Sequence, residues 1–203
     1  MPSLAEFRRG LLGAWRLLLL DAKAVAYFDG SVAGGLRSFW VAVVVVPLYI
    51  AAGAIPRPVS SDPPPPHNAA VDLLGFLVSW PLLMVVVYVL ARWCGKRERF
   101  WLYVSASNWA QVLQSIGMLL VTACFAAAGS LVNLSSPETA ATSGAVLGAI
   151  AAIAAMFLFM AVFAYEWYVA WVSLDSGVAL PIIVVLLDIV TTLALDRLST
   201  ALA

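Results

Sequence analysis

The chain has 203 residues, of which 64% are apolar and 11% charged, and its basic and acidic residues balance to a formal net charge of zero. Its mean hydropathy of +0.99 lies well above the range of water-soluble domains, which need more polar surface at this size. This composition excludes an ordinary soluble domain. It also argues against nucleic-acid binding, because no basic stripe is available to neutralise phosphates. The lipid bilayer is therefore the first expected partner.

The first expected element is an amphipathic helix near the N-terminus. Between Leu11 and Ala22, apolar residues recur at helical spacing with basic residues between them. Such a helix lies along the membrane interface and does not cross the bilayer. Its expected apolar face consists of Leu11, Leu12, Trp15, Leu18 and Leu19. Asp29-Gly30 and Gly34-Gly35 are expected to break the chain and to end this N-terminal segment, residues 1–37.

The rest of the chain, residues 38–203, predicts an all-α, polytopic transmembrane helical bundle. A helix needs about 20 apolar residues to cross a hydrocarbon core of about 30 Å. The expected spans are about 38–55, 72–93, 100–132, 144–173 and 178–195. The third is longer than one crossing needs, so it is either one long tilted helix or an interfacial entry followed by a span. Four spans, with the last two apolar runs partly re-entrant, are the main alternative to five.

A proline-rich loop is expected after the first span. Pro56 and prolines 63–66 predict an extended, hydrated connector, which also carries the only histidine, His67. His67 has no cysteine or carboxylate at metal-ligand spacing, and the two cysteines, Cys94 and Cys124, are too far apart in sequence for a zinc knuckle. We therefore expect no metal and no cofactor.

The distribution of basic residues predicts the orientation of the chain. Except for Arg57 and Arg197, every Lys and Arg lies before residue 40 or in the segment 92–99. Cytoplasmic segments of membrane proteins carry an excess of Lys and Arg. The N-terminus is therefore expected in the cytoplasm, and an odd number of spans puts the C-terminus outside. The Ala-, Val-, Leu- and Arg-rich, Lys-poor composition indicates a GC-rich genome, and we expect a bacterial cytoplasmic membrane.

Two carboxylates within the expected spans require an explanation, because a charged side chain at the centre of a span costs about 2.5–3.5 kcal/mol. Glu166 lies eleven residues before Gly177 and Asp188 eleven after it, so an antiparallel helix pair turning at this glycine holds them at equal depth. The same count along the third span brings Gln111 to this depth, with Asn108 on the same helical face. We hypothesise an intramembrane polar layer of Asn108, Gln111, Glu166 and Asp188.

This layer has two possible roles. It could bind a proton, a cation or a polar substrate, or it could hold helices together by hydrogen bonds. Because the interior of the spans contains no Lys, Arg or His that would complete a relay, the structural role is favoured.

Two further patterns occur in the fourth expected span. Gly144, Gly148 and Ala152 recur at four-residue spacing, and such a stripe of small residues lets helix backbones approach closely. We expect it to pack inside the chain and not between two copies. Aromatic residues near the cytoplasmic end of the span are typical of an interfacial belt. These residues are Tyr165, Trp167, Tyr168 and Trp171.

The order of these segments resembles bacterial members of the Yip1 family, with a cytoplasmic amphipathic start, five spans and a basic turn before a third span of polar entry. The stretches 103–116 and 171–180 are similar to that family's third-span entry and to its turn between the fourth and fifth spans. The proline run and the intramembrane acids have no counterpart in this pattern. The resemblance implies a helical membrane protein of the trafficking or membrane-organisation type, with no functional residues to carry over.

Enzyme motifs are missing from the sequence. It contains no glycine-rich phosphate loop, no Gly-x-Ser-x-Gly elbow and no His-Glu-x-x-His motif. We therefore expect a non-enzymatic accessory, scaffold or membrane-organising subunit that has a membrane-protein partner or forms a homo-oligomer. The alternative is a small transporter or channel subunit that uses the layer around Glu166 and Asp188.

Overall fold

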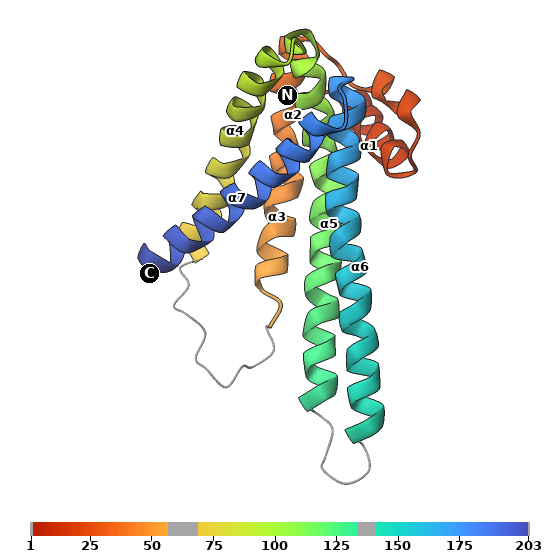
Figure 1. The fold of residues 1–203 in the computed structure, drawn as a ribbon, viewed down its shortest axis with the longest axis vertical. Helices are drawn as coiled ribbons and strands as arrows, with labels where there is room; N and C mark the ends of the chain where they lie inside the picture. The colour runs from red at the N-terminus through yellow and green to blue at the C-terminus, as the bar shows by residue number, and fades with distance from the viewer. Residues whose placement is uncertain (1, 57–68, 134–140, 203) are drawn as a thin grey trace.

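The structure, a computed structural model, describes residues 2–56, 69–133 and 141–202. Every regular element in these ranges is helical, and the helices form an all-α bundle (Figure 1). The predicted fold class is therefore confirmed. Most of the predicted proline-rich loop, together with His67, lies outside the described residues. The segments long and apolar enough to cross a membrane are Val32–Gly53, Ala69–Trp93, Arg97–Leu131 and Gly144–Leu174, and a shorter apolar one is Ala179–Leu195.

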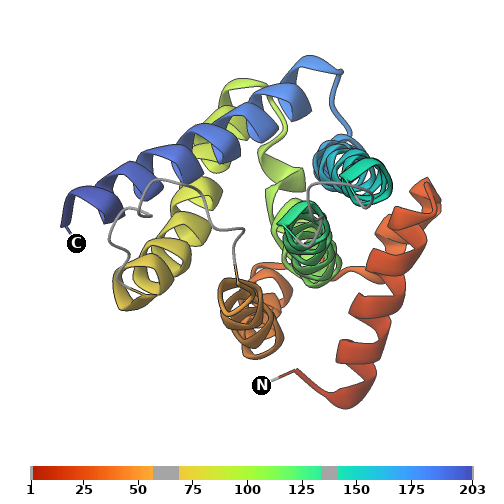
Figure 2. The same ribbon diagram turned by 90° about the horizontal axis from the view of Figure 1, so that it is seen from below.

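The N-terminal helix lies across one end of the bundle. Helix α1, Leu4–Leu18, begins after Ser3, whose hydroxyl accepts a hydrogen bond from the backbone N–H of Glu6. A 3-10 helix, η1 (Ala22–Tyr27), follows it. Figure 2 looks along α5 and α6, and α1 lies lengthwise in that view, so it runs across these long helices. Helix α1 starts and ends earlier than the predicted stretch because local capping, and not the apolar stripe alone, defines its ends.

The first candidate span consists of two helices with a short turn between them. Its parts are α2 (Val32–Ser38), η2 (Phe39–Val41) and α3 (Ala42–Gly53). The sequence predicts a chain break at Gly34-Gly35, but both glycines lie inside α2. The reason is packing, because a Cβ atom on Gly35 would lie 2.6 Å from the ring of Trp101. Gly35 lets α2 approach α5 closely, Gly34 leaves room for the Asp29 side chain, and the helical segment starts before the predicted residue 38.

The remaining helices are long. Their bounds are α4 (Ala69–Trp93), η3 (Arg97–Arg99), α5 (Phe100–Asn133), α6 (Ala141–Leu174) and α7 (Ala179–Leu202). The third apolar region is one continuous helix, α5. With 34 residues each, α5 and α6 are about 51 Å long. They lie side by side, and at one end of the molecule they extend beyond the other helices (Figure 1).

Helix α7 runs antiparallel to α4 on the other side of the bundle (Figures 1 and 2). Near the start of α4, a Cβ atom on Gly75 would lie 3.9 Å from the Cβ of Leu195, which is close to the end of α7. Helix α7 therefore covers the same distance along the bundle as α4. Since α4 is a candidate span, α7 has the reach of a fifth span although its apolar stretch is shorter.

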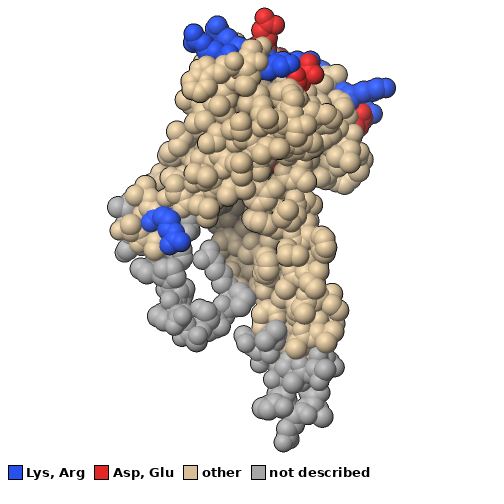
Figure 3. Space-filling view, in the orientation of Figure 1, with Lys and Arg blue, Asp and Glu red and all other residues tan. Residues whose placement is uncertain are grey.

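Charged side chains gather at one end of the molecule, which we call the charged end. Figure 3 shows Lys, Arg, Asp and Glu there, whereas the surface along the helices carries few charges apart from a basic residue near the C-terminus. At the charged end Asp175, between α6 and α7, forms an ion pair of 3.3 Å with Arg99. Its backbone carbonyl also accepts a hydrogen bond from Lys96. These contacts join the two helix connections at the charged end.

Candidate functional site

The two acids of the predicted layer interact with each other. Glu166 on α6 and Asp188 on α7 are close enough for their carboxylates to interact electrostatically. Tyr103 on α5 interacts with both acids and with the Ser107 hydroxyl one turn further along. Tyr103 is 2% exposed, and the other three residues are half-buried. We call Tyr103, Ser107, Glu166 and Asp188 the acid cluster.

The turn between α6 and α7 explains why the acids meet. Helix α6 ends at Leu174 and α7 begins at Ala179, so the turn is centred close to Gly177. Asp175 in this turn has a positive φ of 49°, which helps the chain to reverse within a few residues. Two antiparallel helices that start from one tight turn keep equal sequence distances at equal depth. The turn therefore brings the acids together in depth, and the packing of α6 on α7 brings them together laterally.

The chemistry of the acid cluster follows from its lack of a basic partner. Among the described residues, no Lys, Arg or His forms an ion pair with either Glu166 or Asp188. Two adjacent carboxylates in apolar surroundings repel each other when both are charged. Protonation of one of them, or a cation bound nearby, removes this repulsion.

Asn108 belongs to a different cluster. The indole Nε1 of Trp80 on α4 donates to its Oδ1 at 2.9 Å, and its Nδ2 donates to the Ser38 Oγ of α2 at 2.7 Å. The Ser38 hydroxyl donates in turn to the carbonyl of Gly35 at 2.6 Å. Asn108 is 0% exposed, so these bonds form a buried connection between α2, α4 and α5, which we call the Asn108 bridge.

The prediction of one layer with four members therefore has to be corrected. Asn108 follows Tyr103 by five residues, which corresponds to about 140° around a helix, so the two side chains lie on different faces of α5. Gln111 follows Ser107 by one turn, is half-buried, and forms no hydrogen bond with another described residue. The structure joins Glu166 to Asp188, and it assigns Asn108 to helix packing.

The predicted aromatic belt is also divided by the structure. The Tyr165 hydroxyl donates to the carbonyl of Ala14 at 2.8 Å, and the Tyr168 hydroxyl donates to the carbonyl of Leu20 at 2.7 Å. Both acceptors belong to α1 or to the residues just after it. These tyrosines therefore hold α1 against α6, a role that sequence periodicity cannot reveal.

Small residues form the inner face of α1. A Cβ atom on Gly10 would lie 2.3 Å from the Trp109 ring of α5, so only glycine fits there. Ala14 and Leu17 on the same face are fully buried. Together with the two tyrosine hydrogen bonds, these contacts form what we call the α1 clamp. The sequence does not reveal this face, because Gly10 and Ala14 carry little hydrophobic signal.

The outer face of α1 is apolar and uncovered. Leu12 is 48% exposed, Trp15 50% and Leu19 63%. Leu18 is also exposed, and Leu11 is half-buried. We call Leu12, Trp15 and Leu19 the apolar stripe. The residues predicted for the apolar face thus point mostly away from the bundle, as a helix at a membrane interface requires.

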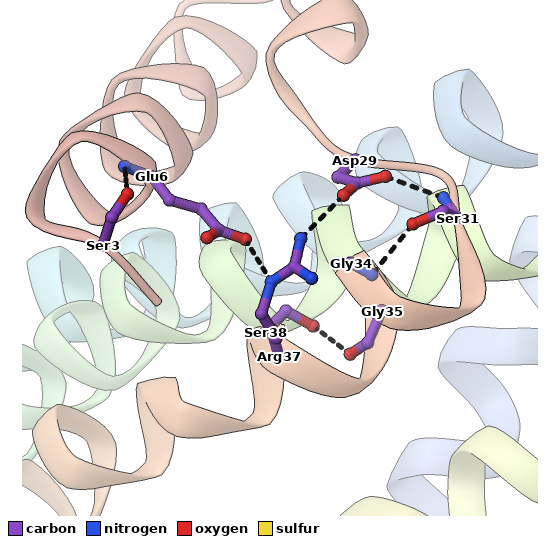
Figure 4. A network of polar contacts seen from close by, with 8 residues as sticks. All are labelled: Ser3, Glu6, Asp29, Ser31, Gly34, Gly35, Arg37 and Ser38. Carbon is purple, nitrogen blue, oxygen red and sulfur yellow. Dashed lines mark hydrogen bonds and ion pairs between the residues drawn. The ribbon is translucent and has the colours of Figure 1, made fainter. Parts of the chain in front are cut away.

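An ion-pair network joins α1 to α2 at the charged end (Figure 4). Arg37 donates from Nε to Glu6 on α1 and from a terminal nitrogen to Asp29, both at 3.0 Å. Asp29 also accepts a hydrogen bond from the backbone N–H of Ser31 at 2.9 Å. This hydrogen bond, followed by the positive charge of Arg37, lowers the pKa of Asp29 below its usual value.

The predicted stripe of small residues on α6 is partly covered. Gly148 is buried, and Gly144 and Ala152 are half-buried. A second close contact, which the sequence did not indicate, occurs further along, where a Cβ atom on Gly117 of α5 would lie 2.8 Å from Val162 of α6. Gly117 therefore allows α5 and α6 to approach each other closely at this point.

Compared with models of known protein families, with curated proteins and with solved structures, the chain matches none. Within the described parts of the chain, no group of three or more His, Cys, Asp or Glu side chains could hold a metal ion. Several long apolar helices and a single charged end define the class of this molecule. It is a multi-pass α-helical membrane protein, whose apolar surface contacts the lipid bilayer.

Proposed function

We propose that the protein is a membrane-organising subunit that holds an amphipathic helix rigidly in the cytoplasmic interface of the membrane it spans. The observation that carries this proposal is the apolar stripe on a clamped helix. The inner face of α1 is fixed by Gly10 and by hydrogen bonds from Tyr165 and Tyr168, while its outer face is apolar and uncovered. An amphipathic helix of this kind inserts its apolar face between headgroups and acyl chains.

The lengths of the helices support this position of α1. Gly10 of α1 packs on Trp109, which is nine residues beyond the start of α5 at Phe100 and therefore about 14 Å from the charged end. From Trp109 to Asn133 the helix continues for about 36 Å, close to the thickness of a hydrocarbon core of about 30 Å. Helix α1 thus lies at the level where the core would begin.

The acids also lie near the level of α1. Tyr165, the neighbour of Glu166, bonds to Ala14 of α1, so the acid cluster lies close to the level of α1. A carboxylate near the interface costs less than one at the centre of a bilayer. This supports the proposal that the clamped helix α1, and not the acid cluster, carries the main function. A bacterial cytoplasmic membrane and the Yip1-like resemblance remain parts of this proposal.

The first test measures where α1 lies. A single reporter cysteine, Trp15→Cys, is introduced after Cys94→Ser and Cys124→Ser, spin-labelled, and the full chain is reconstituted into vesicles of phosphatidylcholine and phosphatidylglycerol. The label should be more accessible to oxygen than to a water-soluble nickel complex, whereas a label at Lys23→Cys, an exposed polar position, should show the reverse. Equal access of the nickel complex to both labels would refute an interfacial α1.

The second test asks whether the stripe shapes the membrane. Reconstituted wild-type protein should reduce the mean vesicle diameter, because a wedge in one leaflet favours curvature. Replacing the stripe by Leu12→Ser, Trp15→Ser and Leu19→Ser should abolish the effect. Tyr165→Phe with Tyr168→Phe should weaken it while leaving the stripe intact. A stoichiometric protein that co-purifies with the wild type, and not with the serine variant, would instead assign the stripe to a partner.

The acid cluster favours a second candidate function, a proton or cation site of a small transporter or channel subunit. The supporting observation is that Glu166 and Asp188 from different helices interact without a basic partner. In proteoliposomes, Glu166→Gln and Asp188→Asn should abolish a proton or cation flux, and Glu98→Gln, at an exposed acid of the charged end, should not. If both acid variants assemble normally and no flux exists to be lost, the transport hypothesis fails.

A further inference from the structure

A groove of about 760 Å³ lies between α1 and α5. Its walls are almost entirely apolar. They include Leu11, Leu12 and Trp15 of α1 and Val112, Leu113 and Ile116 of α5. Helix α5 runs away from the charged end, so these α5 residues lie deeper than Trp109, where α1 crosses. The groove therefore lies on the side of α1 that faces away from the charged end.

Two arginines of α1 border this apolar groove, Arg8 and Arg9. Arg9 donates a hydrogen bond to the carbonyl of Ala26 at 2.9 Å, but neither guanidinium forms an ion pair with a carboxylate of any described residue. Other arginines of the charged end do have such partners, as Arg16 has Asp21 at 2.8 Å. The groove thus has two uncompensated positive charges at one side and hydrocarbon on its walls.

We propose that this groove binds one anionic phospholipid of the surrounding leaflet. Its phosphate is held by Arg8 and Arg9, and one acyl chain lies along the α5 wall near Ile116. Guanidinium groups bind phosphate through charge-assisted hydrogen bonds, frequently two at a time. The groove volume is within the range of ligand sites, about 300–1,000 Å³. An acyl chain would cover the apolar side chains of α1 and α5 that line this groove.

A neighbouring cavity gives the lipid headgroup room. This cavity, of about 560 Å³, shares Arg9 and Tyr27 with the groove and is lined by Glu6, Asp29 and Arg37. Polar groups beyond the phosphate, such as the hydroxyls of a glycerol headgroup, can reach these side chains. The apolar groove, the two arginines at its border and the polar cavity beyond Arg9 thus correspond to the acyl chain, the phosphate and the headgroup of a phospholipid.

The test measures lipid binding to the delipidated full chain in mild detergent by native mass spectrometry, with phosphatidylglycerol and phosphatidylcholine as probes. Wild type should bind one phosphatidylglycerol in preference to phosphatidylcholine. Arg8→Gln with Arg9→Gln should weaken phosphatidylglycerol binding about 30-fold, from about 1 kcal/mol for each basic residue. The matched control, Lys23→Gln with Arg97→Gln, removes two exposed cations elsewhere and should leave binding unchanged. Equal weakening in both double variants would overturn the proposal.

A second variant tests the contribution of the acyl chain separately from that of the arginine charges. Ile116 is 39% exposed, so Ile116→Trp fills the groove without removing a buried side chain. It should abolish the preference for phosphatidylglycerol while the melting temperature stays unchanged. Glycerophosphoglycerol, the same headgroup without acyl chains, should not compete, and competition at equal concentration would overturn a lipid site. The proposal rests on the interfacial position of α1, which the spin-label experiment tests separately, so a failure of lipid selectivity alone leaves that position standing.

Discussion

Replacing Asn108 by leucine tests whether this residue holds helices together or belongs to a functional site. Asn108→Leu keeps a similar volume and removes both hydrogen bonds of the Asn108 bridge, to Trp80 and to Ser38. The buried indole N–H of Trp80 is left without its acceptor, whereas the Ser38 hydroxyl keeps its own bond to Gly35. The bridge should therefore contribute stability, and its loss should not depend on any ligand.

The expected magnitude follows from these bonds. A hydrogen bond contributes about 0.5–1.5 kcal/mol, and a buried donor without a partner costs about 1–3 kcal/mol. Measured hydrogen bonds between transmembrane helices are weaker, about 0.6 kcal/mol on average. We expect Asn108→Leu to lower the free energy of unfolding by about 2 kcal/mol. In a double-mutant cycle with Trp80→Phe, the coupling energy should lie near 1 kcal/mol.

The assay is unfolding of the full chain in mixed micelles, followed by circular dichroism. Gln111→Leu is the matched control, because Gln111 lies on the same helix, is half-buried and forms no hydrogen bond with a described residue. It should change the free energy of unfolding by less than about 0.5 kcal/mol. If Asn108→Leu costs no more than Gln111→Leu, or if the coupling with Trp80→Phe is zero, the Asn108 bridge does not stabilise the fold as argued.

Two further predictions concern the attachment of α1 and the ion-pair network. Gly10→Ala adds a Cβ that would lie 2.3 Å from Trp109, so it should destabilise the protein by about 1–3 kcal/mol and speed hydrogen exchange in α1. The control is Gly75→Ala, which should be neutral or stabilising because its Cβ has no contact closer than 3.9 Å. Because the hydrogen bond from Ser31 lowers the pKa of Asp29, the stabilisation is present above its unfolded pKa of about 3.9 and is lost as the pH falls through the lower folded pKa. Melting temperatures between pH 6 and pH 3 should therefore fall more for the wild type than for Asp29→Asn, and parallel curves would contradict the network.

The acid cluster shows which features of a site can be predicted from the sequence and which cannot. The equal distances of Glu166 and Asp188 from Gly177 gave their equal depth, since depth along antiparallel helices depends only on residue count. The partners on α5 could not be obtained in this way. Tyr103 interacts with the acids, and Asn108 bonds to Trp80 on another face of α5, because the rotation of α5 about its axis is set by all the side chains that pack against it.

Two local features also look different in the sequence and in the structure. Gly34-Gly35 looks like a chain break in sequence, but close packing on Trp101 keeps these residues helical. Tyr165 and Tyr168 look like an interfacial belt, but their hydroxyls bond to carbonyls more than a hundred residues earlier in the chain. Contacts of that sequence separation leave no periodic pattern.

The sequence by itself determined that the chain is an α-helical membrane protein, which segments are long enough to cross, and that its charges lie mainly at one end. Apolar length and charge distribution are properties of local stretches, and the bilayer acts on each stretch directly. Only the tertiary structure decided that α1 is clamped across the long helices, and that this leaves an apolar stripe and an arginine-bordered groove uncovered. These features depend on which faces of distant helices meet, and packing across the whole bundle decides that.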